Sequence, residues 1–227
     1  MTATRVATVV TAAGSSARMG GAGKKEFRSL GGVPALAMAI RPFLALGRVV
    51  VTLPAGRLAE ASALLAPHLD VAALQLVEGG GTRQESVRRG LLALADDPPD
   101  VVLIHDGARP WLTADLVARV LEAATRFGAC VPVVEVSEAV KEVSGDAGGD
   151  AARFVLRHLP RHTLRSAQTP QGFSYPSILN AHEHAFLEGL SYVDDAEVYE
   201  RFAPVAWVPG DPSNRKITFP EDLEEES

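Results

Sequence analysis

Short apolar runs alternate with longer amphipathic stretches from the N-terminus to residue 134. Each apolar run is bounded by Gly, Pro or polar residues, a pattern that predicts buried strands. These predicted strands cover residues 6–10, 49–53, 74–77, 101–104 and 129–134. Between them, apolar residues recur at helical spacing over residues 34–46, 58–65, 84–94 and 114–126, and Thr113 is placed to cap the last helix.

The alternation of predicted strands and helices indicates the fold class. A strand, a helix and a further strand form a right-handed crossover, and repetition of that unit gives a mostly parallel sheet with helices on both faces. The run Val-Val-Leu-Ile at residues 101–104 suits a strand that is buried on both faces. We therefore predict a Rossmann-like, doubly wound α/β fold in a single domain, residues 1–227.

The pattern changes after residue 134. Residues 135–143 alternate like a half-exposed strand, residues 144–152 form a Gly- and Asp-rich turn, and residues 153–158 return as a second strand. We interpret residues 136–165 as a hairpin-like arm. A two-stranded arm is only marginally stable alone, so we expect it to pack on another surface, such as a second subunit. Helices over 177–187 and 195–202 and a strand over 205–208 follow.

Composition narrows the class of protein. Hydrophobic residues make up 47% and charged residues 22% of the 227 residues, the balance of a globular protein. No apolar run approaches the roughly 20 residues of a membrane span, and the N-terminal run is too short for a secretory signal, so we expect a cytoplasmic protein without a membrane partner. The single cysteine, Cys130, fits a reducing compartment and a buried strand position. The net charge of −6 argues against nucleic-acid binding.

The first candidate site is the loop that leaves the first predicted strand, where open α/β sheets bind their ligands. Small residues at 12–16 let the backbone approach a phosphate, and the cations Arg18 and Lys25 follow in the same segment. The spacing matches neither the P-loop pattern nor the glycine pattern of dinucleotide-binding proteins. On composition alone, a flexible turn with solvated cations is the alternative interpretation.

Two further motifs each follow a predicted strand. Residues 78–86 place three glycines before a helix, where backbone N–H groups could hold an anion or a base edge, although Thr82 and Glu85 could equally form a capping box. Asp106 and Arg109 follow the strand at 101–104, and their side chains suit a magnesium ion, a ribose hydroxyl or a phosphate. The alternative is a structural Asp–Arg pair. We interpret His105 as a packed structural residue.

Polar residues also gather in two later segments. Residues 165–173 combine polar side chains with Pro and Gly and predict a shaped loop. Lys216, near the C-terminus, could supply a point charge to a site or be a solvated lysine on an edge strand. No Gly-x-Ser-x-Gly motif of a serine hydrolase is present.

In this order, the motifs resemble those of the 2-C-methyl-D-erythritol 4-phosphate cytidylyltransferase family of the non-mevalonate isoprenoid pathway, from residue 12 to residue 223. The Ala-Ala-Gly-x-x-x-Arg-Met loop is typical of the wider nucleotidyltransferase group. The series Thr-Arg-Gln-x-Ser, His-Asp-x-Ala-Arg-Pro, Gln-Thr-Pro-Gln and Lys-Ile-Thr-x-Pro-x-Asp-Leu is more specific. The resemblance implies a nucleotidyltransferase fold and transfer of CMP from CTP to the acceptor 2-C-methyl-D-erythritol 4-phosphate, with release of pyrophosphate.

The resemblance also implies roles for individual residues. It assigns catalysis to Arg18, Lys25, Arg161 and Lys216, with Mg²⁺ bridging the triphosphate and Asp106 as a candidate ligand of that ion. The implied nucleotide contacts are Ala12, Ala13, Gly14, Ser15, Ser16, Arg18, Lys25, Gly80, Gly81, Ser86 and Asp106. The implied acceptor contacts are Asp106, Arg109, Arg161, Thr169 and Lys216. In this family the arm lends an arginine to the active site of a partner subunit, so the match at Arg161 implies a homodimer.

Two departures from the family pattern concern the acceptor side. Ala139 and Val193 each stand where the family usually has Thr, so that two hydroxyls are missing. Loss of one neutral hydrogen bond costs roughly 0.5–1.5 kcal/mol, or a few-fold to about tenfold in affinity. A cytidylyltransferase for another polyol phosphate, such as ribitol 5-phosphate, therefore stays open as an alternative, as does a non-catalytic nucleotide-binding relative. The absent glycine pattern argues against a dinucleotide-dependent oxidoreductase.

Overall fold

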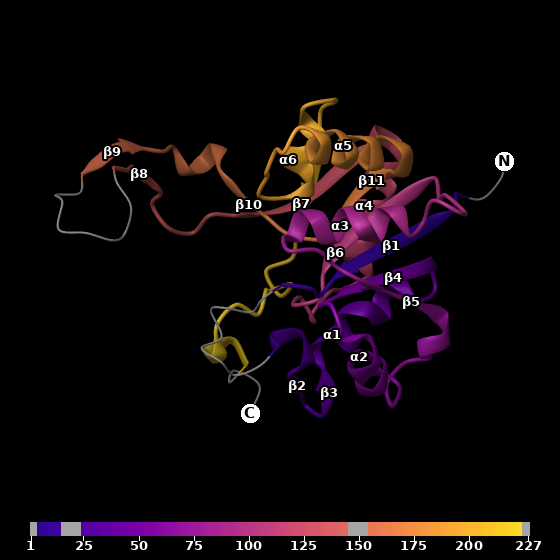
Figure 1. Cartoon of the computed structure of the whole chain (residues 1–227). Coiled ribbons are helices and arrows are strands. Elements are labelled where there is room, and N and C mark those ends of the chain that lie inside the picture. The colour runs from indigo at the N-terminus through magenta and orange to yellow at the C-terminus, as the bar shows by residue number, and fades with distance from the viewer. Residues whose placement is uncertain (1–3, 15–23, 145–153, 224–227) are drawn as a thin grey trace.

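A twisted central sheet organises the molecule (Figure 1). The structure, a computed structural model, describes residues 4–14, 24–144 and 154–223. Among these residues the main sheet has eight strands, in the order β10-β7-β11-β6-β1-β4-β5 with β12 beside β7. The strands are β1 (Val6–Thr11), β4 (Gly47–Leu53), β5 (Leu74–Glu78), β6 (Val101–Asp106), β7 (Ala129–Glu135), β10 (Arg165–Ala167), β11 (Gln171–Ser174) and β12 (Ala206–Pro209).

Parallel pairing dominates the half of the sheet that contains β1. Strand β1 pairs in parallel with both β4 and β6, and β4 pairs in parallel with β5. The antiparallel strand β11 lies between β6 and β7, and β10 is antiparallel to β7. The mostly parallel, Rossmann-like sheet predicted from the sequence is confirmed.

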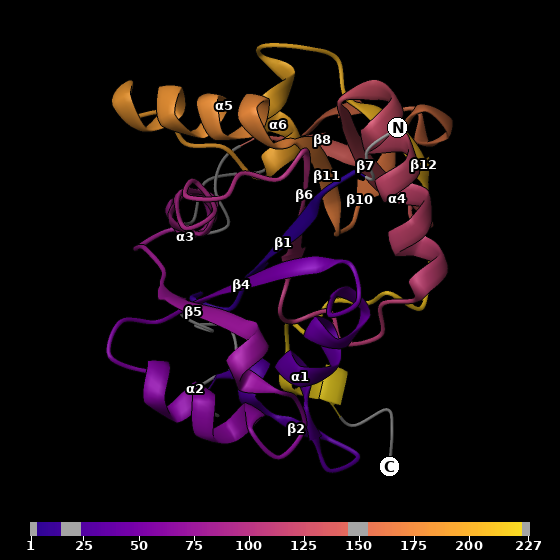
Figure 2. The same ribbon diagram turned by 90° about the vertical axis from the view of Figure 1, so that its right-hand side faces the viewer.

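Helices cover both faces of this sheet (Figure 2). The helices α1 (Ala35–Ile40), α2 (Leu58–Leu65) and α4 (Ala114–Phe127) pack on one face, and α3 (Arg83–Leu92), α5 (Tyr175–Leu187) and α6 (Asp195–Glu200) pack on the other. Successive strand residues face opposite layers, so that Val10 joins the first core cluster and Val9 the second. Strand β6 is buried over its whole length, as expected for a strand that is covered on both faces.

Short elements complete the fold. Strands β2 (Ser29–Leu30) and β3 (Val33–Pro34) form a small separate hairpin. The helix predicted over residues 34–46 is α1 followed by the 3-10 turn η3 (Arg41–Phe43), because Pro42 has no N–H to continue the helical ladder. The other 3-10 turns among the described residues are η2 (Lys25–Phe27), η4 (Val71–Ala73), η5 (Arg161–Thr163) and η6 (Pro220–Leu223). Within the described ranges, no helix has the length and apolarity needed to cross a bilayer.

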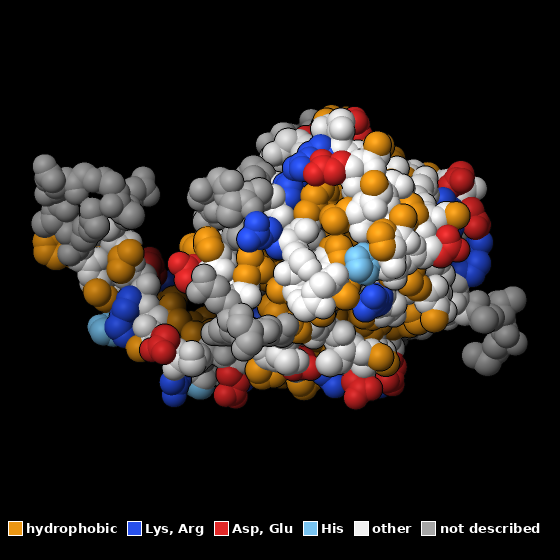
Figure 3. Space-filling model, turned by 90° about the horizontal axis from the view of Figure 1, so that it is seen from below, with side chains coloured by type: hydrophobic (Ala, Val, Ile, Leu, Met, Phe, Trp, Pro, Cys, Tyr) orange, Lys and Arg blue, Asp and Glu red, His pale blue; other side chains and the backbone are white. Residues whose placement is uncertain are grey.

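An arm projects away from the sheet and its helices (Figures 1 and 3). It contains the antiparallel strands β8 (Lys141–Val143) and β9 (Val155–His158), joined by a segment outside the described residues. Its side chains include the exposed apolar residues Val143, Phe154, Val155 and Leu156. The prediction of one strand over residues 135–143 is wrong in part: β7 ends at Glu135, where its pairing with β10 ends, and pairing resumes only at Lys141.

The segment 165–173, predicted as a shaped loop, is largely strand. Strands β10 and β11 flank a turn with a cis peptide bond between Thr169 and Pro170. Gly172 permits the close packing of β11 under α4, because a Cβ atom there would lie 2.8 Å from Cβ of Ala124. These strands are too short and too polar to give a periodic pattern, so the sequence indicated only the turn.

Candidate active site

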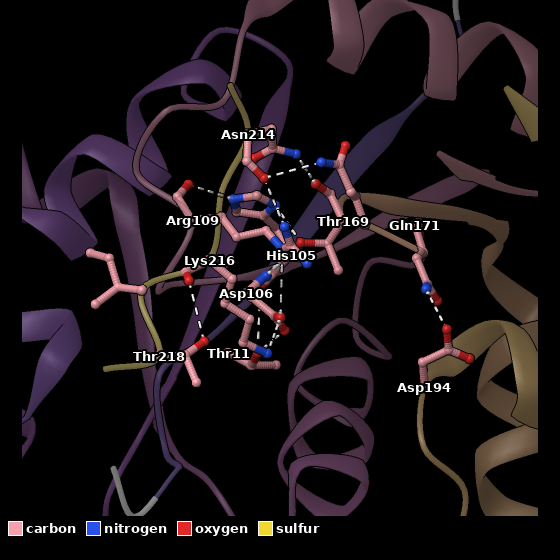
Figure 4. Close-up of polar contacts among 12 residues, drawn as sticks. Thr11, His105, Asp106, Arg109, Thr169, Gln171, Asp194, Asn214, Lys216 and Thr218 are labelled. Atoms are coloured by element: carbon pink, nitrogen blue, oxygen red, sulfur yellow. Dashed lines mark hydrogen bonds and ion pairs between the residues drawn. The ribbon is translucent and has the colours of Figure 1, made fainter. Parts of the chain in front are cut away.

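The candidate site lies at the carboxyl ends of β1 and β6 (Figure 4). Thr11, the last residue of β1, is the register partner of Asp106, the last residue of β6. Element η2 follows β1, and the glycine segment 79–81 follows β5, so segments after the parallel strands β1, β5 and β6 lie at the same edge of the sheet. Ligands of open α/β sheets bind at such an edge.

Asp106 is the centre of a cluster of cations. Its Oδ2 atom lies 2.6 Å from Nζ of Lys216 and 3.9 Å from Nε of Arg109, and its Oδ1 atom lies 3.0 Å from Nε of Arg83. Burial alone would raise the pKa of Asp106, but the charges of Arg83 and Lys216 hold it well below its ordinary value. Asp106 is therefore a fixed carboxylate, and the surplus of positive charge around it suits an anionic ligand.

His105 and Thr169 hold the backbone of Asp106. Nε2 of His105 lies 3.2 Å from the carbonyl oxygen of Arg109, which can only accept, so Nε2 carries the proton. Nδ1 then accepts from the hydroxyl of Thr169 at 2.9 Å, and the same hydroxyl oxygen accepts the N–H of Asp106 at 3.1 Å. Burial lowers the pKa of His105 to about 4, which keeps the ring neutral. The interpretation of His105 as a structural residue agrees with this arrangement.

The C-terminal segment is tied across the site by polar side chains. Nη1 of Arg109 donates to the carbonyl oxygen of Asn214 at 2.7 Å, and Nδ2 of Asn214 donates to the carbonyl oxygen of Thr169 at 2.7 Å. The N–H of Ile217 donates to the carbonyl oxygen of Ala108 at 2.8 Å. These bonds place Lys216 over Asp106 without a regular strand, so Lys216 is not the solvated edge-strand lysine of the alternative interpretation.

Lys25 lies beside the same segment. Its Nζ atom donates to the carbonyl oxygen of Ile217, the residue that follows Lys216, at 2.8 Å. The neighbouring Lys24 is buried and donates to the carbonyl oxygen of Gly14, at the start of the loop. Burial lowers the pKa of Lys24, while Glu26 acts in the opposite direction. Of the predicted site residues in this loop, Ser15, Ser16 and Arg18 lie outside the described residues.

The two small-residue loops are in direct contact. A Cβ atom on Gly79 would lie 2.4 Å from Cβ of Ala13, so the backbones of the loops approach as closely as glycine allows. The N–H of Gly80 donates to Oγ of Ser86 at 3.0 Å, and the N–H of Gly81 donates to Oε2 of Glu85 at 2.8 Å. These two N–H groups, which we expected to be open to a ligand, are thus capped by the protein in this structure.

The helix cap at Thr82 differs from a capping box. The Thr82 hydroxyl accepts the N–H of Glu85 at 3.0 Å, as predicted. The Glu85 carboxylate accepts from Gly81 and pairs with Arg89 at 2.6 Å, so the return bond is made one residue earlier than in the standard box. The result is a glycine segment held rigidly by residues of α3.

Arg161 stands apart from the cluster at Asp106. It lies in η5, between β9 and β10, where its Nη1 atom donates to the carbonyl oxygen of Ser137 at 2.7 Å. Both residues belong to the arm. The structure therefore brings Asp106, Arg109 and Lys216 together, places Lys25 on the backbone carbonyl of Ile217, and leaves Arg161 with the arm.

The sequence interpretation missed three residues of this site, namely Lys24, Arg83 and Asp195. Arg83 bridges Asp106 and Asp195, which lies 2.8 Å from its Nη2 atom. Arg83 belongs to the Thr-Arg-Gln-x-Ser motif, in which Thr82, as a helix cap, and Ser86, as a nucleotide contact, had predicted roles, whereas Arg83 had none. No spacing rule links Arg83 to Asp195, because the two residues meet only when α3 and α6 pack on the same face of the sheet.

The side chains at this edge do not form a complete magnesium site by themselves. Over the described residues, no group of three or more His, Cys, Asp or Glu side chains could hold a metal. Asp106 is one carboxylate with both oxygens already in contact with cations, which does not fit an all-protein metal cage. It does fit an ion that arrives with phosphate ligands, because Mg²⁺ in nucleotide sites is held by one or two carboxylates, phosphates and water.

Comparisons with known proteins identify the family of this chain. A family model of 2-C-methyl-D-erythritol 4-phosphate cytidylyltransferase matches residues 6–226. A curated bifunctional enzyme IspD/IspF of Rhodopseudomonas palustris (strain HaA2) is 40% identical over 224 residues, which are 98% of this chain and 54% of that protein. The chain thus spans about half the length of the curated relatives that it matches.

Solved structures show the same fold. The crystal structure of 2-C-methyl-D-erythritol 4-phosphate cytidylyltransferase from Thermus thermophilus is 38% identical, with a TM-score of 0.77 over 97% of this chain and 96% of that chain. The crystal structure of 4-diphosphocytidyl-2C-methyl-D-erythritolsynthase from Anaerococcus prevotii has a TM-score of 0.81, covering 98% of this chain and 96% of that chain. At 24% identity, that second likeness concerns the fold alone.

Proposed function

The chain belongs to the 2-C-methyl-D-erythritol 4-phosphate cytidylyltransferase family, and on that premise we propose that it transfers CMP from CTP to 2-C-methyl-D-erythritol 4-phosphate. The products are the CDP-linked polyol and pyrophosphate. One observation carries the proposal: a buried, ionised Asp106 is surrounded by Lys216, Arg83 and Arg109 at the carboxyl ends of β1 and β6. A cationic site at that edge of a nucleotidyltransferase fold suits a triphosphate and a second phosphate.

The proposed reaction is an in-line displacement at phosphorus. A phosphate oxygen of the acceptor attacks the α-phosphorus of CTP, a new P–O bond forms, and the bond to the β-phosphate oxygen breaks with its electrons on pyrophosphate. Negative charge spreads over the oxygens of the five-coordinate transition state. Fixed cations stabilise that charge without reorganising, and we assign this role to Lys25 and, outside the described residues, to Arg18.

We assign the nucleotide to the two loops that meet at Gly79 and Ala13. The proposed contacts within the described residues are Ala12, Ala13, Gly14, Lys25, Gly80, Gly81, Ser86 and Asp106. Ser15 and Ser16 complete the same loop by resemblance. Ser86 supports this assignment by a bond to the N–H of Gly80 at 3.0 Å, which fixes the glycine backbone that a base or sugar would approach.

We assign the acceptor to the side of Arg109 and Lys216. Arg109 also lines a cavity of about 540 Å³ together with Ser166, Gln168 and Arg215, close to the base of the arm. The predicted contact of Thr169 with the acceptor stays a prediction, since its hydroxyl is already shared between His105 and Asp106. We propose that Arg161 of a second subunit completes the site, so that the working unit is a homodimer.

We propose that Mg²⁺ binds to the site together with CTP. The ion would neutralise the triphosphate and draw electron density from the leaving pyrophosphate. Asp106 is the described carboxylate placed to meet it. The assignment of residues 1–227 to one catalytic domain with residues 136–165 as a dimerisation arm, and the cytoplasmic location, belong to the same proposal.

The test is an acceptor panel. The protein is incubated with CTP, Mg²⁺ and each polyol phosphate in turn, and pyrophosphate release is followed. We expect the highest kcat/KM with 2-C-methyl-D-erythritol 4-phosphate. A preference for ribitol 5-phosphate would overturn the acceptor assignment, and CTP binding without turnover on any acceptor would make the chain a nucleotide-binding relative.

A further inference from the structure

A series of charged and polar side chains in contact runs from Asp106 to the helices on one face of the sheet. Arg83 Nε lies 3.0 Å from Oδ1 of Asp106, and Arg83 Nη2 lies 2.8 Å from Oδ2 of Asp195. On the far side, Oδ1 of Asp195 lies 3.2 Å from Nε2 of His182. The four residues therefore form one continuous series, and Lys216 adds a fifth member at Oδ2 of Asp106.

The inner end of this series is closed to substrate. The side chain of Asp195 is 1% exposed and that of His182 is 0% exposed, whereas that of Arg83 is 27% exposed. Burial alone would raise the pKa of Asp195, but the charge of Arg83 and the contact with His182 hold it below its ordinary value. A buried carboxylate without a partner is strongly unfavourable, so Asp195 fixes the position of the guanidinium that it faces.

The three helices that carry the series are joined by further polar contacts. Arg83 is the first residue of α3, Asp195 the first residue of α6, and His182 lies in α5. Gln84 holds the α5–α6 connection, because its side chain donates to the carbonyl oxygen of Leu190 at 3.0 Å and accepts the N–H of Tyr192 at 2.9 Å. The same end of α3 also carries the glycine segment 79–81.

From these contacts we infer that Asp195 and His182 are positioning residues for the proposed reaction. They hold Arg83 between two carboxylates, and Arg83 in turn holds Asp106 so that its Oδ2 atom meets Lys216. This inference rests on the proposed function, since Asp106 and Lys216 are assigned to the reacting site there. Neither Asp195 nor His182 touches a substrate; both act through Arg83.

Asp195 can influence Asp106 because the two carboxylates share the guanidinium of Arg83. With Asp195 ionised, Arg83 is drawn toward both carboxylates and contributes one N–H contact to Asp106. With Asp195 neutral, Arg83 is free to turn fully toward Asp106 and make a two-pronged pair, as guanidinium and carboxylate groups prefer. Asp106 would then shift away from Lys216 and the bound ligands would lose their alignment.

The first experiment measures turnover in Asp195→Asn, which removes the charge and keeps the shape. We expect kcat to fall by roughly tenfold to a hundredfold, as for loss of a charged hydrogen bond, while the dissociation constant of CTP changes about threefold or less. The matched control is Glu183→Gln, which breaks the 2.8 Å ion pair with Arg88 between α3 and α5, two of the three helices that carry the series, and should leave kcat within about twofold. Equal loss in both variants would overturn the inference.

A double-mutant cycle then separates positioning from general damage. If Asp195 acts through Arg83, Asp195→Asn should produce no further loss of kcat in an Arg83→Gln background. His182→Gln should resemble Asp195→Asn with a smaller effect. Losses that multiply in the double variant would mean that Asp195 acts independently of Arg83, and the inference would be wrong.

A second readout needs no turnover and keeps the inference separate from the proposed function. In urea unfolding, Asp195→Asn should destabilise the wild type but stabilise Arg83→Gln, because there it removes a buried carboxylate that has lost its guanidinium. If Asp195→Asn lowers the stability of the wild type and raises that of Arg83→Gln, the coupling between Asp195 and Arg83 is supported, even if the wild type transfers CMP to no acceptor. Destabilisation of the same size in both backgrounds would overturn it.

Discussion

Lys216 Nζ lies 2.6 Å from Oδ2 of Asp106, although 110 residues separate the two along the chain. The bonds from Arg109, Asn214 and Ile217 hold the C-terminal segment in the position that makes this pair possible. Asp106 is buried and Lys216 is about one-third exposed, so the cation lies between a fixed carboxylate and the space above the sheet. The pair therefore presents a positive charge whose position is set by the fold.

Removal of the Lys216 charge should damage turnover. We expect Lys216→Gln to lower kcat by roughly a hundredfold, because a fixed cation near the developing charge is lost. The acceptor KM should rise with it, and CTP binding should change less. The control is Arg126→Gln, the same loss of charge at an exposed position of α4, which should leave kcat unchanged. Unaltered turnover of Lys216→Gln would remove this residue from the catalytic machinery.

Lys25 should act mainly in the transition state. We expect Lys25→Ala to reduce kcat by roughly 10²–10³-fold and to weaken CTP binding far less. Steady-state kinetics combined with a direct titration of CTP distinguishes the two effects. Equal losses in kcat and in CTP affinity would mean that Lys25 binds the ground state and the transition state alike.

Because Arg161 lies on the arm, away from Asp106, we expect each active site to be shared between two subunits. Mixed dimers of Arg161→Ala with Lys25→Ala should recover activity, since one of the two composite sites in such a dimer carries both intact residues. Each variant alone should be nearly inactive. Activity in the mixture that does not exceed the average of the two separate variants would show that Arg161 serves its own chain or no site.

His105 gives the protein a defined pH dependence of stability. Its pKa is about 4 in the folded chain against 6.5 for an ordinary histidine, so between these values the unfolded chain binds a proton that the folded chain does not. The free energy of unfolding should therefore fall by roughly 3 kcal/mol from this residue as the pH drops from about 6.5 to about 4.

Urea unfolding at a series of pH values measures that contribution. In His105→Asn, whose amide oxygen can still accept from Thr169, the fall in stability over this range should be smaller than in the wild type. His68→Asn, at a half-exposed position, should keep the wild-type slope. An identical pH slope in wild type and His105→Asn would contradict a neutral, buried His105.

The fold was largely predictable because its central strands are buried on both faces. The apolar runs near residues 49–53 and 101–104 have no alternating pattern, and this absence itself indicates parallel strands between two helix layers. Strands β10 and β11 were not predictable. The polar residues around Thr169 form a turn and make hydrogen bonds to distant parts of the chain, so they do not alternate with apolar residues as in a half-buried strand.

The candidate site was predictable where local sequence creates it. Asp106 at the end of a buried strand and Lys25 after a small-residue loop were both found in this way. Arg83 and Asp195 escaped because their contact is a consequence of packing between helices that lie far apart in the chain, which no local pattern encodes. Gly80 and Gly81 are a different case, because Ser86 and Glu85, which bind their N–H groups, lie only six and four residues further along the chain.

The most direct test of the proposed activity follows the α-phosphorus itself. CTP radiolabelled at its α-phosphate is incubated with the protein, Mg²⁺ and 2-C-methyl-D-erythritol 4-phosphate, and the products are separated. We predict that the label appears in the CDP-linked polyol, in step with the pyrophosphate released. Label that stays in CTP, or that appears only as free CMP, would contradict the assignment of this chain as a cytidylyltransferase for that acceptor.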